Sequence, residues 1–183
     1  MFGPADLAGY VRRKVARQLG DDPVADLRCG WDEHVAFGLE HPAVYALVHG
    51  DPVTSTTSLL AREGFASLLK LVERVAQTGR LKVSVPHAAR LIAAAEEGVT
   101  LQLITIPAKE RDAKLSAATR EAVVSAATLP ATSAGGRKDV DSGRVIARAV
   151  ALRAGLGGVP GVFSPAEQDL LGNWLDRLAS AER

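Results

Sequence analysis

The sequence predicts an all-α protein, and three observations support this prediction. Alanine and leucine dominate the composition, whereas aromatic residues make up only 4%. The apolar residues mostly recur at helical spacing, and few segments show the period of two that is typical of strands. With 183 residues, of which 47% are hydrophobic and 23% charged, the chain has ample apolar material for a folded core and is not intrinsically disordered.

The N-terminal part of the chain predicts three helices. The first covers about residues 4–19. The second runs from Pro23 to about Glu40, because aspartate followed by proline is a typical helix start and Pro42 disfavours helical geometry just before it. A short helix over residues 42–48 follows.

The middle of the chain predicts three more helices, over residues 58–77, 86–106 and about 110–129. Residues 81–85 alternate like a strand but are too few to form a sheet. The helix over residues 86–106 is the most apolar, so it is expected to be central and buried on several sides. Its interior is expected to include Leu91, Ile92, Ala95, Val99, Leu103 and Ile106.

Two helices are expected to close the chain after a polar loop at residues 130–142. The first covers about residues 144–156. The second begins at Ser164, where Pro165 at the first helical position and Glu167 at the third complete the pattern of a capping box.

Charge and cysteine content narrow the class of protein. A net charge of +1 and a pI of about 7.9 lack the basic excess of a free-standing nucleic-acid binder. The single cysteine, Cys29, excludes an intrachain disulfide, and its place inside a helix favours a buried, inert thiol. No signal peptide or membrane-spanning run is apparent, so a soluble cytoplasmic protein without a membrane partner is expected.

Motifs for catalysis are mostly absent. The sequence contains no phosphate-binding loop, no dinucleotide fingerprint and no H-E-x-x-H, so neither an enzyme nor a cofactor is expected. Glu96 and its neighbour Glu97 point about 100° apart on a helix, so they cannot form a facing carboxylate pair. One of them could point into a cavity and the other at a basic neighbour, but we favour a solvated edge. The enzyme alternative is a small metal-dependent hydrolase that uses His34, His41, His49 and Glu96.

A ligand pocket is expected between the helices that start near residues 23, 58 and 86, because they supply apolar lining and a few polar groups. The same residues could instead be plain core. The candidate pocket residues are Trp31, His34, Val35, Tyr45, Leu68, Val72, Leu91, Ala95 and Gln102.

The last two helices carry broad apolar stripes, which predict a dimer through an intermolecular four-helix bundle. Alternatively, one face packs only on the subunit's own core. The candidate interface residues are Val145, Ala149, Leu152, Leu171, Trp174 and Leu178.

Several segments, in this order, resemble the ligand-binding domain of TetR-family transcriptional regulators. Residues 31–45, WDEHVAFGLEHPAVY, are similar to a family stretch that links two helices, with His41 where asparagine or a similar residue is usual. Residues 79–99, with GRLKV and AAR, and residues 163–178, FSPAE through WLDRL, are similar to later segments. The resemblance covers the chain from about Asp21 to its end.

The resemblance implies a homodimer that binds a small, often apolar or aromatic molecule and contacts DNA only through an N-terminal helix-turn-helix head. That head is missing: residues 1–20 resemble only its last part and the connecting helix, and Asp6 stands where lysine or glutamate is usual. Two interpretations are a regulator that has lost its DNA-binding head and a late start codon, and the position of Met1 near the junction favours the second. Residues 21–183 are then the ligand-binding and dimerisation domain. A third hypothesis is a headless interaction protein that forms heterodimers with a full-length relative.

Overall fold

A computed structural model describes residues 19–50, 59–130, 142–158 and 161–180. Almost all of the first predicted helix and residues 131–141 of the predicted loop lie outside these described residues. The expected boundary at residue 20, between a head remnant and the ligand-binding domain, therefore stays a prediction.

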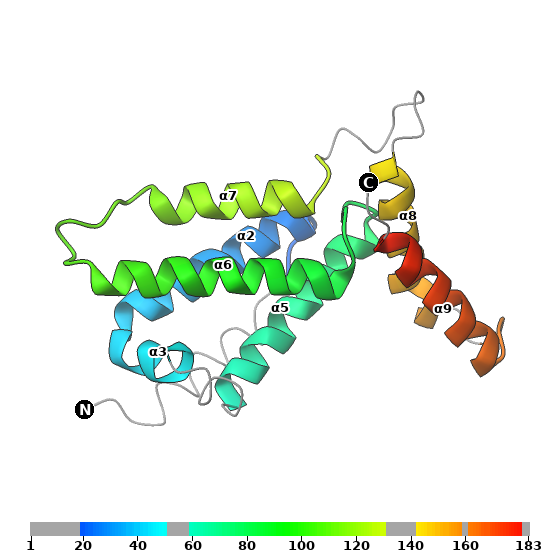
Figure 1. The fold of residues 1–183 in the computed structure, drawn as a ribbon, viewed down its shortest axis with the longest axis horizontal. Helices are drawn as coiled ribbons and strands as arrows, with labels where there is room; N and C mark the ends of the chain where they lie inside the picture. The colour runs from blue at the N-terminus through cyan, green and yellow to red at the C-terminus, as the bar shows by residue number, and fades with distance from the viewer. Residues whose placement is uncertain (1–18, 51–58, 131–141, 159–160, 181–183) are drawn as a thin grey trace. The chain divides into compact units, whose positions relative to one another are not determined.

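The described residues form seven α-helices, one short 3-10 helix and no strand, which confirms the all-α prediction (Figure 1). Two expected helix starts are confirmed by their caps. The side chain of Asp22 accepts a hydrogen bond from the backbone of Val24, and Ser164 and Glu167 form the complete capping box. The helices are α2 (Pro23–Glu40), α3 (Pro42–His49), α5 (Leu59–Gln77), α6 (Val85–Thr105), α7 (Leu115–Ala127), α8 (Ser142–Gly155) and α9 (Pro165–Ala179), with the 3-10 helix η2 (Leu156–Gly158).

The chain divides into two compact units, and the division falls inside α5, inside α6 and near the end of α7. Among the described residues, the first unit takes those up to residue 71 and residues 89–124, and the second takes residues 72–88 and those from residue 125 onwards. Each unit has its own set of buried apolar residues.

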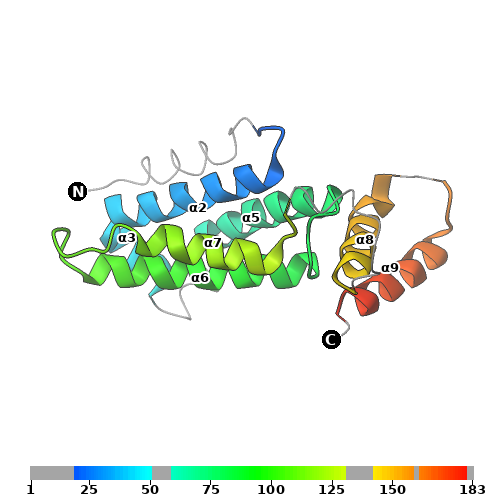
Figure 2. The same ribbon diagram turned by 90° about the horizontal axis from the view of Figure 1, so that it is seen from above.

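In the first unit, α2, α6 and α7 run side by side in both views (Figures 1 and 2). The indole nitrogen of the buried Trp31 donates to the hydroxyl of Ser116, at 3.0 Å, and so joins α2 to α7. Arg28 makes a second link between these helices, because its guanidinium donates to both carboxylate oxygens of Glu121. These hydrogen bonds hold the pKa of Glu121 below its usual value.

The solvent-facing side of α2 carries Cys29, together with Ala25 and Asp32. The expectation of a buried thiol is therefore wrong. Cys29 lies one turn after Ala25 and one turn before Asp32, on the face opposite the buried residues Leu27, Trp31 and His34.

In the second unit, α8 packs against α9 through a small core of Ala149, Leu156 and Leu175, with Leu171 packed on it. A separate contact, which we call the clasp, joins residues 80–82 to residues 127–129. Its backbone hydrogen bonds are Lys82 to Ala127, at 2.8 Å, and Leu129 to Arg80, at 2.7 Å, around a β-bridge between Leu81 and Thr128. The alternating segment thus makes a single bridge, in keeping with its shortness.

Helix α7 begins at Leu115, five residues later than the sequence predicted. The side chain of Arg111 reaches back and donates to the carbonyls of Leu103 and Ile106 at the end of α6. Asp112 accepts from the backbone of Lys114. Arg111 thus satisfies carbonyls at the C-terminal end of α6, and the turn at Asp112 precedes the first residue of α7.

The expected burial of α6 is only partly confirmed. Ile92, Val99 and Leu103 are buried, whereas Leu91 is exposed. Leu91 lies about 100° around the helix from Ile92 and falls outside the face of α6 that Ala88, Ile92 and Val99 share.

Candidate functional site

A partly open cavity lies in the first unit, between α2, α3, α5 and α6. The space open to the centres of water molecules is about 30 Å³, which is room for roughly two waters. The described residues that line the cavity are His34, Phe37, Tyr45, His49, Ala61, Gly64, Phe65, Leu68, Ala93, Glu96 and Glu97.

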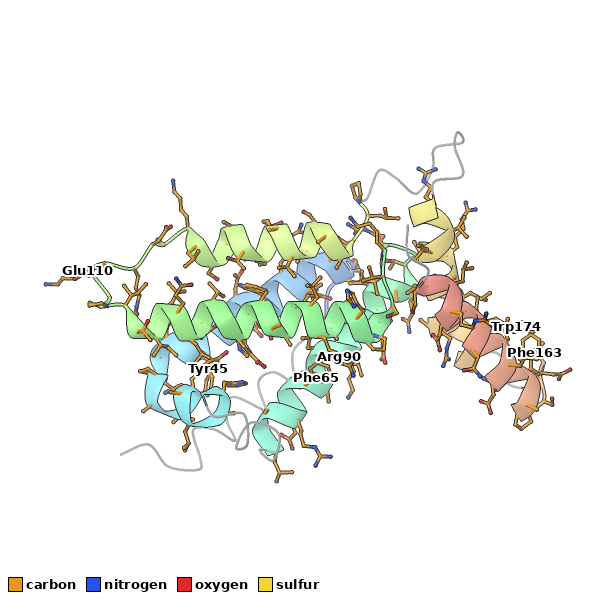
Figure 3. The ribbon with its side chains drawn as sticks, viewed as in Figure 1. Tyr45, Phe65, Arg90, Glu110, Phe163 and Trp174 are labelled. Carbon is orange, nitrogen blue, oxygen red and sulfur yellow. The ribbon has the colours of Figure 1, made fainter. Side chains whose placement is uncertain are left out.

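Helical spacing explains why these residues meet. On α3, Tyr45 and His49 are four residues apart, so their side chains lie on one face. On α6, Ala93 is three and four residues before the two glutamates. In Figure 3, Tyr45 stands on α3 and Phe65 on α5.

Three buried polar side chains from three helices meet at one wall of the cavity. The Nε2 atom of His34 lies 2.6 Å from the hydroxyl oxygen of Tyr45, and its Nδ1 atom lies 3.5 Å from a carboxylate oxygen of Glu96. When His34 is neutral and carries its hydrogen on Nδ1, its Nε2 atom can accept a hydrogen bond from the Tyr45 hydroxyl. Its Nδ1–H group then faces the carboxylate of Glu96 as a donor. Buried polar groups are stable only when they are matched in this way.

His49 and Glu97 form the second polar pair of the cavity. The His49 ring stacks on Tyr45, with centroids 4.4 Å apart. Its Nδ1 atom is buried and makes no hydrogen bond with the described residues, although a carboxylate oxygen of Glu97 lies 3.5 Å away. The geometry therefore leaves a buried nitrogen without a hydrogen bond beside a carboxylate.

Gly38 brings α2 close to this polar wall. A Cβ atom at this position would lie 2.3 Å from the methyl group of Thr100 and 3.0 Å from the ring of Tyr45. Thr100 is fully buried on α6, and its hydroxyl donates to the carbonyl of Glu96. The absence of a side chain at Gly38 thus permits the close approach of α2, α3 and α6.

The predicted pocket residues are found in several environments. His34, Tyr45 and Leu68 line the cavity. The remaining candidates are not among its described lining residues: Trp31, Val35 and Val72 are buried, Ala95 is half-buried, and Leu91 and Gln102 are exposed. The pocket role of these residues stays a prediction.

Sequence reasoning missed other lining residues. Glu97, His49, Phe37 and Phe65 were not included among the pocket candidates, although the spacing of Tyr45 and His49 could have indicated one of them. The remaining omissions were Glu96, which was a candidate site residue only for the metal-dependent enzyme, and the small residues Ala61, Gly64 and Ala93.

The structure corrects the interpretation of the glutamate pair as a solvated edge. Glu96 is only 6% exposed, and both glutamates line the cavity. They do so although they point in different directions, because the cavity extends from the His34 wall to His49.

Of the residues considered for the metal-dependent enzyme, His34, His49 and Glu96 line the cavity. His41 instead lies against the ring of Phe37, with centroids 5.0 Å apart. Within the described part of the chain, no group of three or more His, Cys, Asp or Glu side chains is arranged to hold a metal ion.

The candidate dimer residues of the second unit fall into two groups. Ala149 is part of the α8–α9 core, with Leu171 packed on it, and Val145 is half-buried. Leu152, Trp174 and Leu178 are exposed. Figure 3 labels Trp174 on α9 and Phe163 just before it.

Comparisons with protein-family models, with curated proteins and with solved structures give no match for this chain. None of the described helices combines the length and the apolarity that crossing a membrane would require.

Proposed function

We propose that this chain is the ligand-binding and dimerisation part of a TetR-like transcriptional regulator, which works in the cytoplasm as a homodimer. The observation that carries the proposal is an exposed apolar stripe on the last two helices. We define the stripe as Leu152 on α8 with Leu170, Trp174 and Leu178 on α9.

The stripe has the form of a helical interface. Leu170, Trp174 and Leu178 are spaced by four residues, so they follow one face of α9, and they are 48%, 56% and 42% exposed. Contiguous exposed apolar surface of this kind marks interaction sites. A second copy of the chain would cover it by adding two helices to α8 and α9, which makes a four-helix bundle.

The cavity supports the ligand-binding half of the proposal. It combines apolar and aromatic walls with a few polar groups, which is typical of small-molecule sites. Its small volume fits one end of a ligand, and the apolar or aromatic body of the ligand would extend through the open side. DNA contact is assigned by the resemblance to a helix-turn-helix head, and not to residues 21–183.

Light scattering on the purified chain and on Trp174→Arg tests the dimer. The wild-type chain should have the mass of a dimer, and the variant that of a monomer, because a charge would enter an apolar interface. Leu47→Arg is the control, since Leu47 is also an exposed apolar residue and lies on α3, outside the stripe. A Trp174→Arg protein that stays dimeric would contradict the proposed interface.

The same stripe also favours a second candidate, the interaction protein that forms heterodimers. A wild-type chain that is monomeric by itself would exclude the homodimer. A heterodimer with a TetR-like relative would then be detected by mixing the two proteins and measuring subunit exchange. The absence of exchange would exclude this candidate as well.

A further inference from the structure

We propose that the cavity between α2, α3, α5 and α6 binds the ammonium group of a primary amine. The inference rests on the ligand-binding half of the proposed function and adds the chemical class of the ligand. It depends on three observations: the charge of the lining, the number of hydrogen-bond acceptors and the size of the enclosed space.

The residues that line the cavity favour a ligand that carries a positive charge. Two carboxylates, those of Glu96 and Glu97, face the cavity, and the described lining residues include no lysine or arginine. Tyr45, Phe37 and Phe65 add aromatic rings, whose faces attract cations. Carboxylates and aromatic faces together suit an organic cation and disfavour an anion.

The acceptors match the three donors of a primary ammonium group. The carboxylates of Glu96 and Glu97 supply two of them. The third is the Nδ1 atom of His49, which is buried and makes no hydrogen bond with the described residues, in a side chain that is only 11% exposed. A neutral imidazole that carries its hydrogen on Nε2 has an acceptor on Nδ1. The ammonium would therefore satisfy a buried atom that the fold leaves without a hydrogen bond.

The size of the cavity limits which chemical group of the ligand can enter it. About 30 Å³ of space for water centres holds an –NH₃⁺ group and one or two carbons, and not a bulky quaternary ammonium. Phe65 lines the cavity and is 38% exposed, so it offers an apolar surface at the open side. An alkyl or aromatic body would pack against this ring while the ammonium stays inside.

The test is an NMR titration of the ¹⁵N-labelled chain with three probes of similar size, namely n-butylamine, 1-butanol and butyrate. At neutral pH the first is a cation, the second is neutral and the third is an anion. We expect saturable shifts for amides around the cavity with n-butylamine, at millimolar concentration, and none with the other two probes.

Two substitutions test the carboxylates. Glu96→Gln and Glu97→Gln should each weaken n-butylamine binding by roughly tenfold or more, because each removes a charge-assisted hydrogen bond. Glu63→Gln is the matched control, since Glu63 is an exposed glutamate on α5 that does not line the cavity, and it should leave the affinity unchanged. Glu97 is the partly exposed member of the pair, so its variant keeps the test available if Glu96→Gln does not fold.

The outcomes separate this inference from the proposed function. If 1-butanol binds as tightly as n-butylamine, or if both carboxylate variants bind the amine as well as the wild type does, the ammonium site is wrong and the cavity remains an apolar ligand site. If none of the three probes binds, the cavity is not a small-molecule site and the ligand-binding half of the proposed function fails. The light-scattering test of the dimer is independent of both results.

Discussion

The Nε2 atom of His34 lies 2.6 Å from the hydroxyl oxygen of Tyr45, although the two residues belong to different helices and both are buried. This contact joins α2 to α3 at the cavity wall. Because both groups are removed from water, each depends on the other for its hydrogen bond more than an exposed pair would.

Tyr45→Phe should lower the free energy of unfolding by about 1–2 kcal/mol, because a buried imidazole nitrogen loses its hydrogen-bond partner. Urea denaturation measures the change. In a His34→Phe background the same substitution should cost much less, since the partner is already absent. Equal effects in the two backgrounds would show that the two side chains are not coupled.

Gly38→Ala should destabilise the fold by about 1–3 kcal/mol, because the new methyl group would collide with Thr100 and Tyr45. Gly98→Ala is the matched control on α6, where an added Cβ meets nothing within 4 Å. That substitution should stabilise the helix by up to about 1 kcal/mol, as alanine does at open helical positions. Thermal and urea denaturation of the two variants should therefore shift in opposite directions.

Arg28→Gln should raise the pKa of Glu121 towards its ordinary value, because the Arg28 hydrogen bonds are the largest cause of the lowered pKa, whereas the hydrogen bond from Arg120 remains. Glu121 has a folded-state pKa below its unfolded value, so its stabilising effect is complete above the unfolded pKa and is lost as the pH falls through the folded pKa. The stability difference between wild type and variant should be at most about 1 kcal/mol, since the pair is partly exposed, and should shrink below about pH 4.

Carboxylate chemical shifts measure the pKa in that experiment, and denaturation at several pH values measures the stability. Arg90→Gln is a suitable control, because Arg90 is an exposed arginine on α6. A stability difference that persists unchanged at pH 2 would show that Arg28 stabilises the fold by packing and not through Glu121.

Cys29 should react with a thiol reagent in the folded protein, because its side chain is exposed on α2. A colorimetric aromatic disulfide that liberates nitrothiobenzoate when a thiol attacks it is a suitable reagent. It should release about one equivalent of nitrothiobenzoate per chain, since the sequence contains a single cysteine. A reaction that requires denaturant would mean that the thiol is covered in solution.

The sequence was most informative where a structure depends on neighbouring residues. The starts of α2 and α9 follow from Asp22 and from Ser164 with Glu167, whose hydrogen bonds span two or three positions. The all-α class follows from apolar spacing along the whole chain. Asp112 is a similar local signal shortly before the start of α7, where it accepts a hydrogen bond from the backbone of Lys114.

The sequence was least informative where burial depends on packing between distant segments. The adjacent residues Glu96 and Glu97 had to point in different directions, but only the placement of α2 and α3 shows that Glu96 meets His34 and Glu97 meets His49. The exposure of Cys29 is a different case, because the helical spacing of Leu27, Trp31 and His34 places Cys29 on the opposite face of α2 and could have predicted it. The cavity is therefore a product of tertiary contacts among helices that are separately predictable.

The clasp between residues 80–82 and 127–129 affects what happens when a protease cleaves the chain between α6 and α7. Its two arms flank α6 and α7, and between these helices lie exposed residues that include Lys109 and Glu110, a site open to trypsin. A single cleavage there leaves two fragments, each with one arm of the clasp and one of the two helices. The fragments would remain associated after the peptide bond is broken, so a nicked molecule would still migrate as one species under native conditions and separate only in denaturant.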